Sequence, residues 1–331
     1  MPLDFSRIEA LSGAFCEARA LHAAVALDLF SAVAAGASAA QVATARGLNP
    51  RATELLLNAL AGLELLNKAD GVFTLPEGAR RHLLPDGPES LCGMIRLEAA
   101  WWEPWGRLEE AVRTGLPMVE PGGWQRSPEE TRRFILAMDS LVRARGDAEH
   151  VADTLDFSGV RRLLDVGAGP GTYPMAVCRA HPHVAATILD LPATLAVTTQ
   201  VLRERGMAER VATVAGDFNT DPLPGGFDMV FLSNVIHGED EAHCRALVRK
   251  CLGALNPGGR IVIKDHILSA DRTRPVGGAV FSLHMLLLTR GRDYSLDEVS
   301  GWLAEAGFEP PTVTVLPAPF SSSLVVARRP G

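Results

Sequence analysis

The chain has 331 residues, of which 47% are hydrophobic, and a formal net charge of −7. This length allows two domains, each with a hydrophobic core of its own. The acidic balance, without any run of lysine or arginine, argues against a nucleic acid or an anionic membrane surface as the partner.

The N-terminal segment does not predict export or membrane insertion. It begins MPLDFSRIEA, which lacks the pattern of a signal peptide, and the apolar stretch at 21–40 is interrupted by polar residues. The five cysteines occur at no metal-ligand spacing, so we expect reduced core thiols in a cytoplasmic protein and no metal site. They are Cys16, Cys92, Cys178, Cys244 and Cys251.

A helical domain is expected over residues 1–100. Apolar residues recur at spacings of three and four over 5–35, which predicts one helix there. The next segment predicts a helix, a turn, a second helix and a small hairpin. Its start, stop and turn signals are, in order, Ser38, Gly47, Pro50 and the pair Asp70-Gly71.

This order of elements is that of a winged helix, which commonly binds DNA. The second helix, at 51–66, carries mostly leucine and alanine, with two glutamates and one basic residue. A recognition helix needs basic and polar side chains to contact phosphates and base edges. We therefore interpret the domain as a packing module in a homodimer. The alternative is that helices from 88–156 cover its apolar surface within one chain.

Residues 101–156 are expected to form a helical connector that contributes to a substrate pocket. The helical pattern runs from 88 to 156, with breaks at Pro104 and near Pro117. Aromatic rings beside a cofactor domain suit a flat substrate, although plain core packing explains any single ring equally well. Four of the five tryptophans fall here, namely Trp101, Trp102, Trp105 and Trp124.

A well-marked helix start lies within this connector. Ser127 suits the N-cap, Pro128 the first helical position, and Glu130 the third. Phe134 and Met138 then fall on one apolar face of the helix. That face packs in the core or covers the site.

Residues 157–331 are expected to form an α/β domain with a doubly wound, Rossmann-like sheet. Helical segments are expected between the first five strands, so that helices cover both faces. The last two strands are joined by PAPF and should form a hairpin with one antiparallel strand. The strands are expected near 161–166, 185–189, 210–215, 227–233, 259–268, 312–316 and 321–327.

A glycine-rich turn follows the first of these strands, in LLDVGAGPGTY at 163–173. Its glycines remove every Cβ where a ligand must approach the backbone. The dinucleotide fingerprint GxGxxG would place a third glycine where this chain has Thr172, and Pro170 removes an N–H that a pyrophosphate would need. The turn therefore favours a nucleoside without phosphate. The glycines are Gly167, Gly169 and Gly171.

Acidic residues end three strands in succession at this edge. Asp165 lies just before the first glycine, and Asp190 ends the second strand, where a carboxylate can accept ribose hydroxyls. Asp217 and Phe218 follow the third strand and suit an adenine amino group and ring. Any one of these acids is more often a helix cap or a turn residue. Their order after one glycine turn predicts S-adenosylmethionine (SAM).

A candidate acid–base group follows the fourth strand. His237 lies in VIHGEDE, where a methyl acceptor must lie, Asp265 ends the fifth strand, and Asp293 lies in RGRDYS. Two carboxylates beside one imidazole fix its tautomer and orient it as a base. The structural alternatives are that His237 is only hydrogen-bonded, that Asp265 pairs with Lys264 or Arg260, and that Asp293 caps the next helix.

With these motifs the chain resembles the plant-type (caffeic acid type) SAM-dependent O-methyltransferases and their bacterial natural-product relatives. The resemblance runs nearly end to end and is most specific in DVGAGPG, DLP, GDF and VIHGEDE. It implies a dimerisation domain, His237 as the general base, and Asp265 and Asp293 in the two acidic partner positions. It also implies that Phe134 and Met138 line the acceptor pocket and that S-adenosyl-L-homocysteine (SAH) is the cofactor product.

Some residues depart from the plant pattern, so a lignin-type substrate is not carried over. Ser233 stands where plant members have a lysine, and HGEDE replaces their longer HDWSDE. Both acidic partners are aspartates where the plant enzymes use glutamates. His284 and Thr289 also differ, on the helix that faces the acceptor in the family.

The predicted site has two groups of binding residues besides the catalytic His237, Asp265 and Asp293. The cofactor-binding residues are Asp165, Gly167, Gly169, Gly171, Asp190, Leu191, Asp217, Phe218 and Ser233. The substrate-binding residues are Trp101, Phe134, Met138, His284, Met285 and Leu288.

We expect methyl transfer to a phenolic or enolic hydroxyl of a small-molecule secondary metabolite. A histidine deprotonates such a hydroxyl far more readily than an aliphatic alcohol. Alternatives within the family are C-methylation and SAM-assisted decarboxylation or hydroxylation. From another class, the alternative is a SAM-binding winged-helix regulator, against which the non-basic helix at 51–66 argues.

Overall fold

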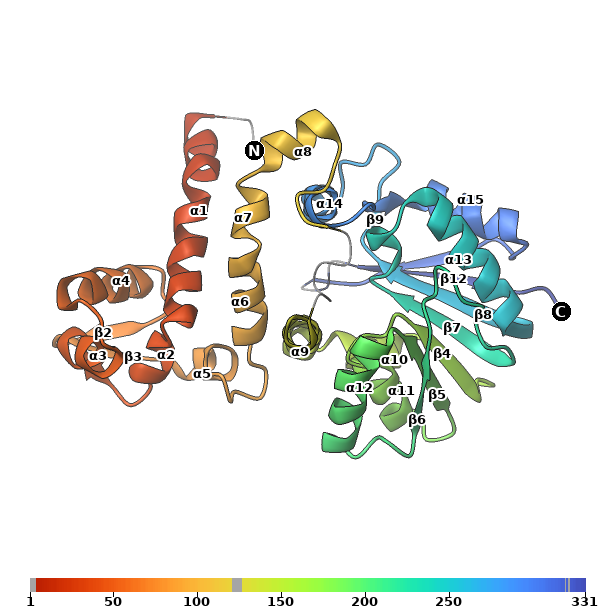
Figure 1. The fold of residues 1–331 in the computed structure, drawn as a ribbon, viewed down its shortest axis with the longest axis horizontal. Coiled ribbons are helices and arrows are strands. Elements are labelled where there is room, and N and C mark those ends of the chain that lie inside the picture. Colours follow the sequence, from red (N-terminus) through yellow and green to blue (C-terminus); the bar gives the residue numbers. More distant parts are fainter. Residues whose placement is uncertain (1–3, 121–126, 319, 321) are drawn as a thin grey trace. The chain divides into compact units, whose positions relative to one another are not determined.

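The computed structural model describes residues 4–120, 127–318, 320 and 322–331. Contacts divide the chain into two compact units, Met1–Trp102 and Glu103–Gly331 (Figure 1). The helices of the predicted connector that follow Trp102 therefore belong to the second unit. Trp124, one of the tryptophans considered for the pocket, lies outside the described residues.

The first unit combines helices with a small antiparallel sheet of order β1-β3-β2. Its elements are α1 (Phe5–Ala26), α2 (Leu29–Ala32), β1 (Ala37–Ser38), α3 (Ala39–Arg46), α4 (Pro50–Gly62), β2 (Asn67–Ala69), β3 (Val72–Thr74), α5 (Glu77–Leu83) and α6 (Cys92–Ala100). Ser38 caps α3, Gly47 ends it with a φ of 66°, and Pro50 opens α4. Asp70-Gly71 joins β2 to β3, so the predicted helix, turn, helix and hairpin are confirmed.

The prediction of one helix over 5–35 is wrong. α1 ends at Ala26, and α2 begins only after Asp28, which has a left-handed φ of 51°. The Asp28 carboxylate accepts hydrogen bonds from the Ser31 hydroxyl at 2.5 Å and from the Arg46 guanidinium at 2.6 Å. These side-chain contacts stabilise a break that no glycine or proline signals in the sequence.

The N-terminal helix α1 presents an apolar surface that its own unit leaves exposed. Phe5, Ile8, Leu11 and Phe15 are between 54% and 76% exposed, although α6 packs on the same helix. Cys16 is exposed as well, so the prediction of core thiols is wrong for this residue and confirmed for the other four cysteines. Helix α1 therefore carries more apolar surface than a small unit covers by itself.

The second unit is built on a seven-stranded sheet of order β11-β12-β8-β7-β4-β5-β6. Its strands are β4 (Arg162–Val166), β5 (Ala185–Asp190), β6 (Val211–Ala215), β7 (Phe227–Ser233), β8 (Leu255–Asp265), β11 (Thr312–Val315) and β12 (Ser323–Arg328). Strands β4 to β8 pair in parallel. Strand β12 runs antiparallel to both β8 and β11, which confirms the predicted C-terminal hairpin.

Helices cover both faces of this sheet (Figure 1). Residues of α9, α10, α11 and α12 pack on one face, and residues of α13 and α15 pack on the other, so the doubly wound fold is confirmed. No helix among the described residues has the length and apolar composition that spanning a membrane requires. The helices are α7 (Trp102–Trp105), α8 (Leu108–Thr114), α9 (Pro128–Arg145), α10 (Asp147–Thr154), α11 (Thr172–Ala180), α12 (Pro192–Glu204), α13 (Glu241–Ala254), α14 (Val276–Leu288) and α15 (Leu296–Ala306).

Two further predictions for this part of the chain are wrong. No helix connects β6 to β7, because the linking residues 216–226 form turns and irregular backbone. Pro222 and Pro224, followed by two glycines, disfavour a helix there. Pro104 does not break a helix but lies inside α7, within the first turn, where no intrahelical N–H is needed.

The strand order determines where a ligand site is expected. From β4 the chain moves outward to β5 and β6, then returns to the other side of β4 with β7 and β8. The carboxyl ends of β4 and β7 therefore meet where the order reverses, which is where doubly wound sheets bind ligands. Beyond β8, the short strands β9 (Ile267–Leu268) and β10 (Tyr294–Ser295) pair in parallel.

Candidate active site

The glycine turn after β4 has a left-handed backbone that favours glycine. Gly167, Gly169 and Gly171 have φ values of 71°, 54° and 76°. A Cβ at Gly171 would lie 2.7 Å from Ile188 Cδ1, and one at Gly167 would lie 3.0 Å from Val235 Cγ2. The turn is thus closely packed on its inner side and presents bare backbone at the carboxyl end of the sheet.

Asp190 and Phe218 converge on this turn. The Asp190 carboxylate accepts hydrogen bonds from the backbone N–H groups of Gly169 at 2.8 Å and Leu191 at 2.7 Å. Burial raises the pKa of Asp190, and these two N–H groups partly offset that rise. The Phe218 ring lies 3.5 Å from the position that a Cβ of Gly167 would take. The predicted cofactor residues on β4, β5 and the loop after β6 therefore lie together.

Asp217 and Ser233 lie at the same edge of the sheet. The Asp217 carboxylate accepts a hydrogen bond from the N–H of Asn219 at 2.8 Å, which shapes the loop after β6. Ser233 ends β7 and is paired with Lys264 in the register of β8.

Asp165 is a buried carboxylate that has no hydrogen-bond partner among the described residues. Its side chain is 1% exposed, and both of its oxygens lack a donor. Burial, followed by the charge of Asp190, raises the pKa of Asp165 well above its ordinary value. An unpaired buried acid is costly, and a bound cationic group would offset that cost.

A further acidic residue, which the sequence analysis missed, supports the glycine turn. Asp139 on α9 accepts hydrogen bonds from the Thr172 hydroxyl at 2.7 Å and the Arg205 guanidinium at 2.8 Å. The hydroxyl of Thr198 donates to the carbonyl of Gly169 at 2.6 Å. The signal was present, since Asp139 falls on the same helical face as the buried Ile135.

His237 and Asp265 form a close pair because β7 and β8 are parallel neighbours. His237 lies in the short 3-10 helix Ile236–Gly238 just beyond β7, and Asp265 ends β8. The ring Nδ1 lies 2.7 Å from Asp265 Oδ1, and the backbone N–H of His237 lies 3.4 Å from Oδ2. The predicted pair is therefore present. Among the described residues, Asp265 forms no hydrogen bond or ion pair with Lys264 or Arg260, which were the alternative partners.

Opposing effects set the pKa of His237. Burial lowers it, but the charge and hydrogen bond of Asp265 raise it, and the net pKa lies above the ordinary value of 6.5. The pKa of Asp265 lies below its ordinary value because His237 outweighs the effect of burial. Asp265 is therefore an acceptor, Nδ1 of His237 donates to it, and Nε2 of the neutral ring is the nitrogen that can take a proton.

Asp293 lies in the same cluster but faces a second histidine. Its Oδ2 lies 3.5 Å from Nδ1 of His266, and one ligand atom each of His237, Asp265 and Asp293 lie within 4.8 Å of one another. The pairing of β9 with β10 brings His266 and Asp293 together. Both predicted carboxylates therefore lie near His237, and His266 adds a second imidazole to the cluster.

The His266 ring was missed, although it directly follows Asp265 in the sequence. It lies 6.4 Å from the His237 ring, and the two planes differ by 19°. Phe281 on α14 stands edge-on to both, with centroids 5.1 Å from His237 and 4.9 Å from His266. Ser295 caps α15, so the alternative role of Asp293 as the cap of this helix is wrong.

His284 on α14 is fixed as a neutral donor. The Trp105 indole N–H donates to Nδ1 of His284 at 3.1 Å. Because an indole can only donate, Nδ1 must accept, and the ring proton resides on Nε2. Burial, with a smaller effect of His237, lowers the pKa of His284 to about 4. The ring is therefore uncharged at neutral pH.

The remaining predicted substrate residues lie on α9 and α14, with one exception. Met285 and Leu288 are buried on α14, and Phe134 and Met138 are half-buried on α9. Trp101 belongs to the first unit, so its place in a pocket stays a prediction. Trp105 contacts a predicted substrate residue, His284, through its indole N–H.

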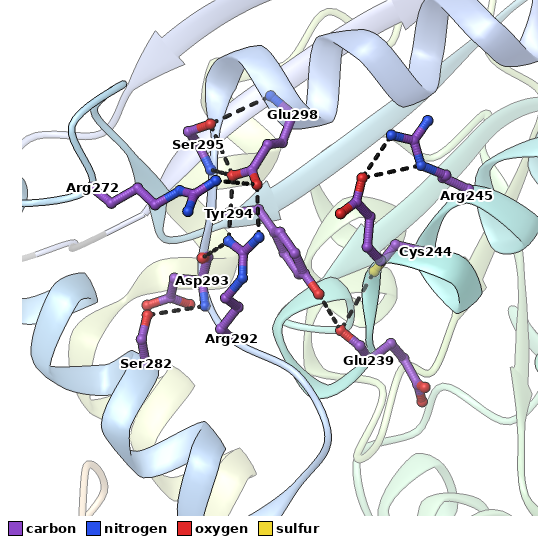
Figure 2. A network of polar contacts seen from close by, with 11 residues as sticks. Glu239, Cys244, Arg245, Arg272, Ser282, Arg292, Asp293, Tyr294, Ser295 and Glu298 are labelled. Carbon is purple, nitrogen blue, oxygen red and sulfur yellow. Dashed lines mark hydrogen bonds and ion pairs between the residues drawn. The ribbon is translucent and has the colours of Figure 1, made fainter. Parts of the chain in front are cut away.

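Tyr294 of β10 contacts the backbone of Glu239, two residues after His237 (Figure 2). The Tyr294 hydroxyl donates to the carbonyl of Glu239 at 2.6 Å, and the Cys244 thiol lies 3.8 Å from the same oxygen. The backbone N–H of Asp293 donates to the Ser282 hydroxyl at 3.1 Å. These contacts fix the backbone at Glu239, two residues after His237, and the backbone at Asp293.

Comparison with known families identifies both units. The family model of the O-methyltransferase domain matches residues 106–309. The family model of the O-methyltransferase dimerisation domain matches residues 9–84. The two matches follow the division of the chain into its two compact units.

Curated proteins and solved structures agree with these matches. The chain is 37% identical over 299 residues to the 3-hydroxy-5-methyl-1-naphthoate 3-O-methyltransferase of Streptomyces sahachiroi, covering 87% of this chain and 84% of the relative. It is 32% identical over 329 residues to the tetracenomycin polyketide synthesis 8-O-methyl transferase TcmO of Streptomyces glaucescens, covering 97% and 95%. The structure of PigF with SAH aligns with a TM-score of 0.90 and 29% identity, covering 99% of this chain and 100% of PigF.

Proposed function

The chain belongs to the SAM-dependent O-methyltransferase family, and we propose that within it His237 is the general base that takes the proton from a phenolic or enolic hydroxyl. The enzyme uses SAM and transfers its methyl group to a hydroxyl of a small-molecule secondary metabolite. The observation that carries the proposal is the 2.7 Å contact between His237 Nδ1 and Asp265, which leaves Nε2 as the proton acceptor.

The residues at the glycine turn fit SAM. The cofactor supplies an electrophilic methyl group on a positively charged sulfur and carries an ammonium group. Asp165 offers an unpaired buried carboxylate for a cation, and the buried carboxylate of Asp190 is placed to accept the ribose hydroxyls. Gly167 and Gly171 keep the backbone open, and Phe218 offers an aromatic face. We propose that these residues, with Gly169, Leu191, Asp217 and Ser233, hold the cofactor.

Replacing Asp190 by alanine should weaken SAM binding by about 2 to 3 kcal/mol. The reason is that two charge-assisted hydrogen bonds between the carboxylate and the ribose hydroxyls are lost from a buried site. The fold should persist. Calorimetric titration with SAM measures the change. Asp228 is a matched control, because it accepts two backbone N–H groups at the amino end of β7, away from the turn. Unchanged SAM affinity in a folded Asp190→Ala protein would remove Asp190 from the site.

The chemistry of the base selects the acceptor. A histidine of ordinary pKa, about 6.5, and a phenol of about 10 differ by roughly 3.5 units, or about 5 kcal/mol. An aliphatic alcohol, near the value of about 15.7 for water, would require roughly 12 kcal/mol. The raised pKa of His237 narrows the gap to a phenol further.

Removal of divalent metal ions should leave methyl transfer unchanged. His237, Asp265 and Asp293 have donor atoms close enough to hold an ion, but His237 Nδ1 is already hydrogen-bonded to Asp265. We therefore expect full activity after treatment with EDTA and desalting. A loss of activity that added Mg²⁺, Mn²⁺ or Zn²⁺ restores would show that this cluster binds a metal.

We propose that the first unit forms a homodimer. The dimerisation match at 9–84 and the exposed Leu11 and Phe15 of α1 support this proposal. Light scattering should give about twice the chain mass of 35.3 kDa. The double substitution Leu11→Glu with Phe15→Glu should shift the protein towards the monomer, because it charges an apolar interface. A mass of 35.3 kDa for the unaltered protein at micromolar concentration would contradict the dimer.

A cytoplasmic location and the absence of nucleic-acid binding stay predictions. The net charge of −7 and the single basic residue at 51–66 support the second of them. An electrophoretic shift assay with DNA at low salt tests it, and also tests the alternative of a winged-helix regulator. A shift that falls steeply with added salt would favour the regulator.

The acceptor class and the position of methylation can be tested together. The protein is incubated with methyl-labelled SAM and a panel of phenols, quinones and hydroxylated polyenes, and the products are identified by NMR. We expect label on the oxygen of phenolic or enolic members. Label on carbon would favour the C-methylation alternative. Acceptor consumption without label transfer would favour decarboxylation or hydroxylation.

A further inference from the structure

We propose that Glu239 is a positioning residue that couples the cofactor loop to the loop after α14, across the turn that carries His237. The cofactor loop is residues 216–222, and the α14–β10 loop is residues 289–293. This inference rests on the cofactor site proposed above. Glu239 lies two residues after His237, in the HGEDE stretch where the chain departs from the plant pattern.

The Glu239 carboxylate is shared by both loops. Its Oε1 accepts a hydrogen bond from the Asn219 side-chain amide at 3.0 Å. Its Oε2 accepts from Arg290 Nε at 2.8 Å and lies 2.6 Å from Arg290 Nη2. The Glu239 side chain is only 13% exposed, whereas that of Arg290 is 42% exposed. One carboxylate therefore joins a residue of the cofactor loop to a residue of the α14–β10 loop.

The backbone of Glu239 is held as tightly as its side chain. Tyr294 donates to its carbonyl, and Cys244 approaches the same oxygen (Figure 2). A Cβ on Gly291 would lie 2.1 Å from the carbonyl oxygen of His237 and 2.6 Å from the backbone nitrogen of Glu239. The α14–β10 loop thus packs directly on the backbone of the turn that carries His237, and a shift of the loop must move this turn.

The cofactor loop is placed to respond to a bound ligand. Phe218, beside Gly167, directly precedes Asn219. Lys250 on α13 donates to the carbonyls of Phe218 and Asn219 at 2.8 Å and 2.9 Å, which gives the loop one anchored side. Ligand contact with Phe218 therefore acts on Asn219 and, through Glu239, on Arg290. In this arrangement cofactor binding orders the α14–β10 loop, which ends at Asp293.

Hydrogen exchange measured by mass spectrometry tests the coupling without turnover. In the unaltered protein, saturating SAH should slow backbone exchange in both 216–222 and 289–293, by about fivefold or more. In Glu239→Gln the slowing should persist at 216–222 and vanish at 289–293. The glutamine keeps the size of the side chain but loses its charge, and its amide presents a donor to one of two donor partners.

Two matched variants make the test specific. Glu241→Gln removes a neighbouring glutamate whose ion pair with Arg245 lies outside this cluster, and it should behave like the unaltered protein. Asn219→Ala removes the hydrogen bond from the cofactor loop to Glu239 and leaves the Glu239–Arg290 pair intact. It should nevertheless also lose the slowing at 289–293. This variant decides the question by itself if Glu239→Gln does not fold.

The possible failures are distinguishable. Slowing at 289–293 that persists in Glu239→Gln, or in Asn219→Ala, would overturn the coupling. So would an unaltered protein that shows slowing at 216–222 alone, and in that case the cofactor site would stand. The absence of slowing in both loops of the unaltered protein would overturn the coupling together with the proposed cofactor site.

Discussion

Replacement of His237 by glutamine should lower turnover by roughly 10²- to 10⁴-fold while SAM affinity stays near normal. Glutamine cannot take the proton, whereas the proposed cofactor contacts come from the glycine turn and Asp190. Turnover with saturating acceptor and calorimetry with SAM measure the two quantities separately. Wild-type turnover in this variant at neutral pH would make His237 structural, and a pre-ionised or carbon acceptor would then be the better account.

The pH dependence gives this prediction a sign. Only the neutral imidazole can act as a base, so wild-type turnover should rise with pH through the pKa of His237, above 6.5, and then level off. The His237→Gln rate should continue to rise, because a phenol ionises by itself near pH 10. Asp265→Asn serves as a control. Loss of its charge should lower the pKa of His237, so that the rise of turnover with pH occurs at lower pH than in the wild type. The loss of turnover should be smaller than in His237→Gln, since Asp265 orients the ring without carrying the proton.

Replacement of Gly291 by alanine should lower turnover on the order of 10²-fold, because a methyl group would displace the turn that holds His237. The new Cβ would meet the His237 carbonyl oxygen at 2.1 Å and the Glu239 carbonyl oxygen at 2.7 Å. Both obstacles are backbone atoms, which cannot move aside cheaply. SAH affinity, measured by calorimetry, should change far less than turnover.

Gly238, in the turn that carries His237, provides the matched control for Gly291→Ala. A Cβ there would meet no atom within 4 Å, and Gly238 has no left-handed φ. Gly238→Ala should therefore keep near-normal turnover. Equal losses in Gly238→Ala and Gly291→Ala, or none in Gly291→Ala, would contradict the close packing of the α14–β10 loop on this turn.

The sequence carries most of the fold, because local signals and packing agree in the second unit. Apolar strands, the glycine turn, the caps at Ser38 and Ser127 and the helix start at Pro50 lie where they were predicted. The break in the N-terminal helix was not predictable, because Asp28 is held by Ser31 and by Arg46, which is distant in the chain. The helix expected between β6 and β7 was assigned from the alternation of strands, against the two prolines present there.

The site was predicted where one strand end carries one chemical group, and missed where groups meet across elements. Asp190 and Asp265 end their strands, and Gly169 and His237 lie shortly after theirs, so the parallel sheet gathers these positions at one edge. The His266–Asp293 pair depends on the short β9–β10 pairing. The proposed role of Glu239 depends on its contacts with side chains from two separate loops. Neither arrangement has a local pattern in the sequence.

The most direct test of His237 as the base is single-turnover methyl transfer to a series of phenols of graded acidity, in the unaltered protein and in His237→Gln. The ratio of the two rates should grow as the phenol becomes less acidic, because only the unaltered protein assists removal of the proton. The most acidic phenols should be nearly insensitive to the substitution. A ratio that stays constant across the series would show that His237 does not move the proton, and would contradict the mechanism.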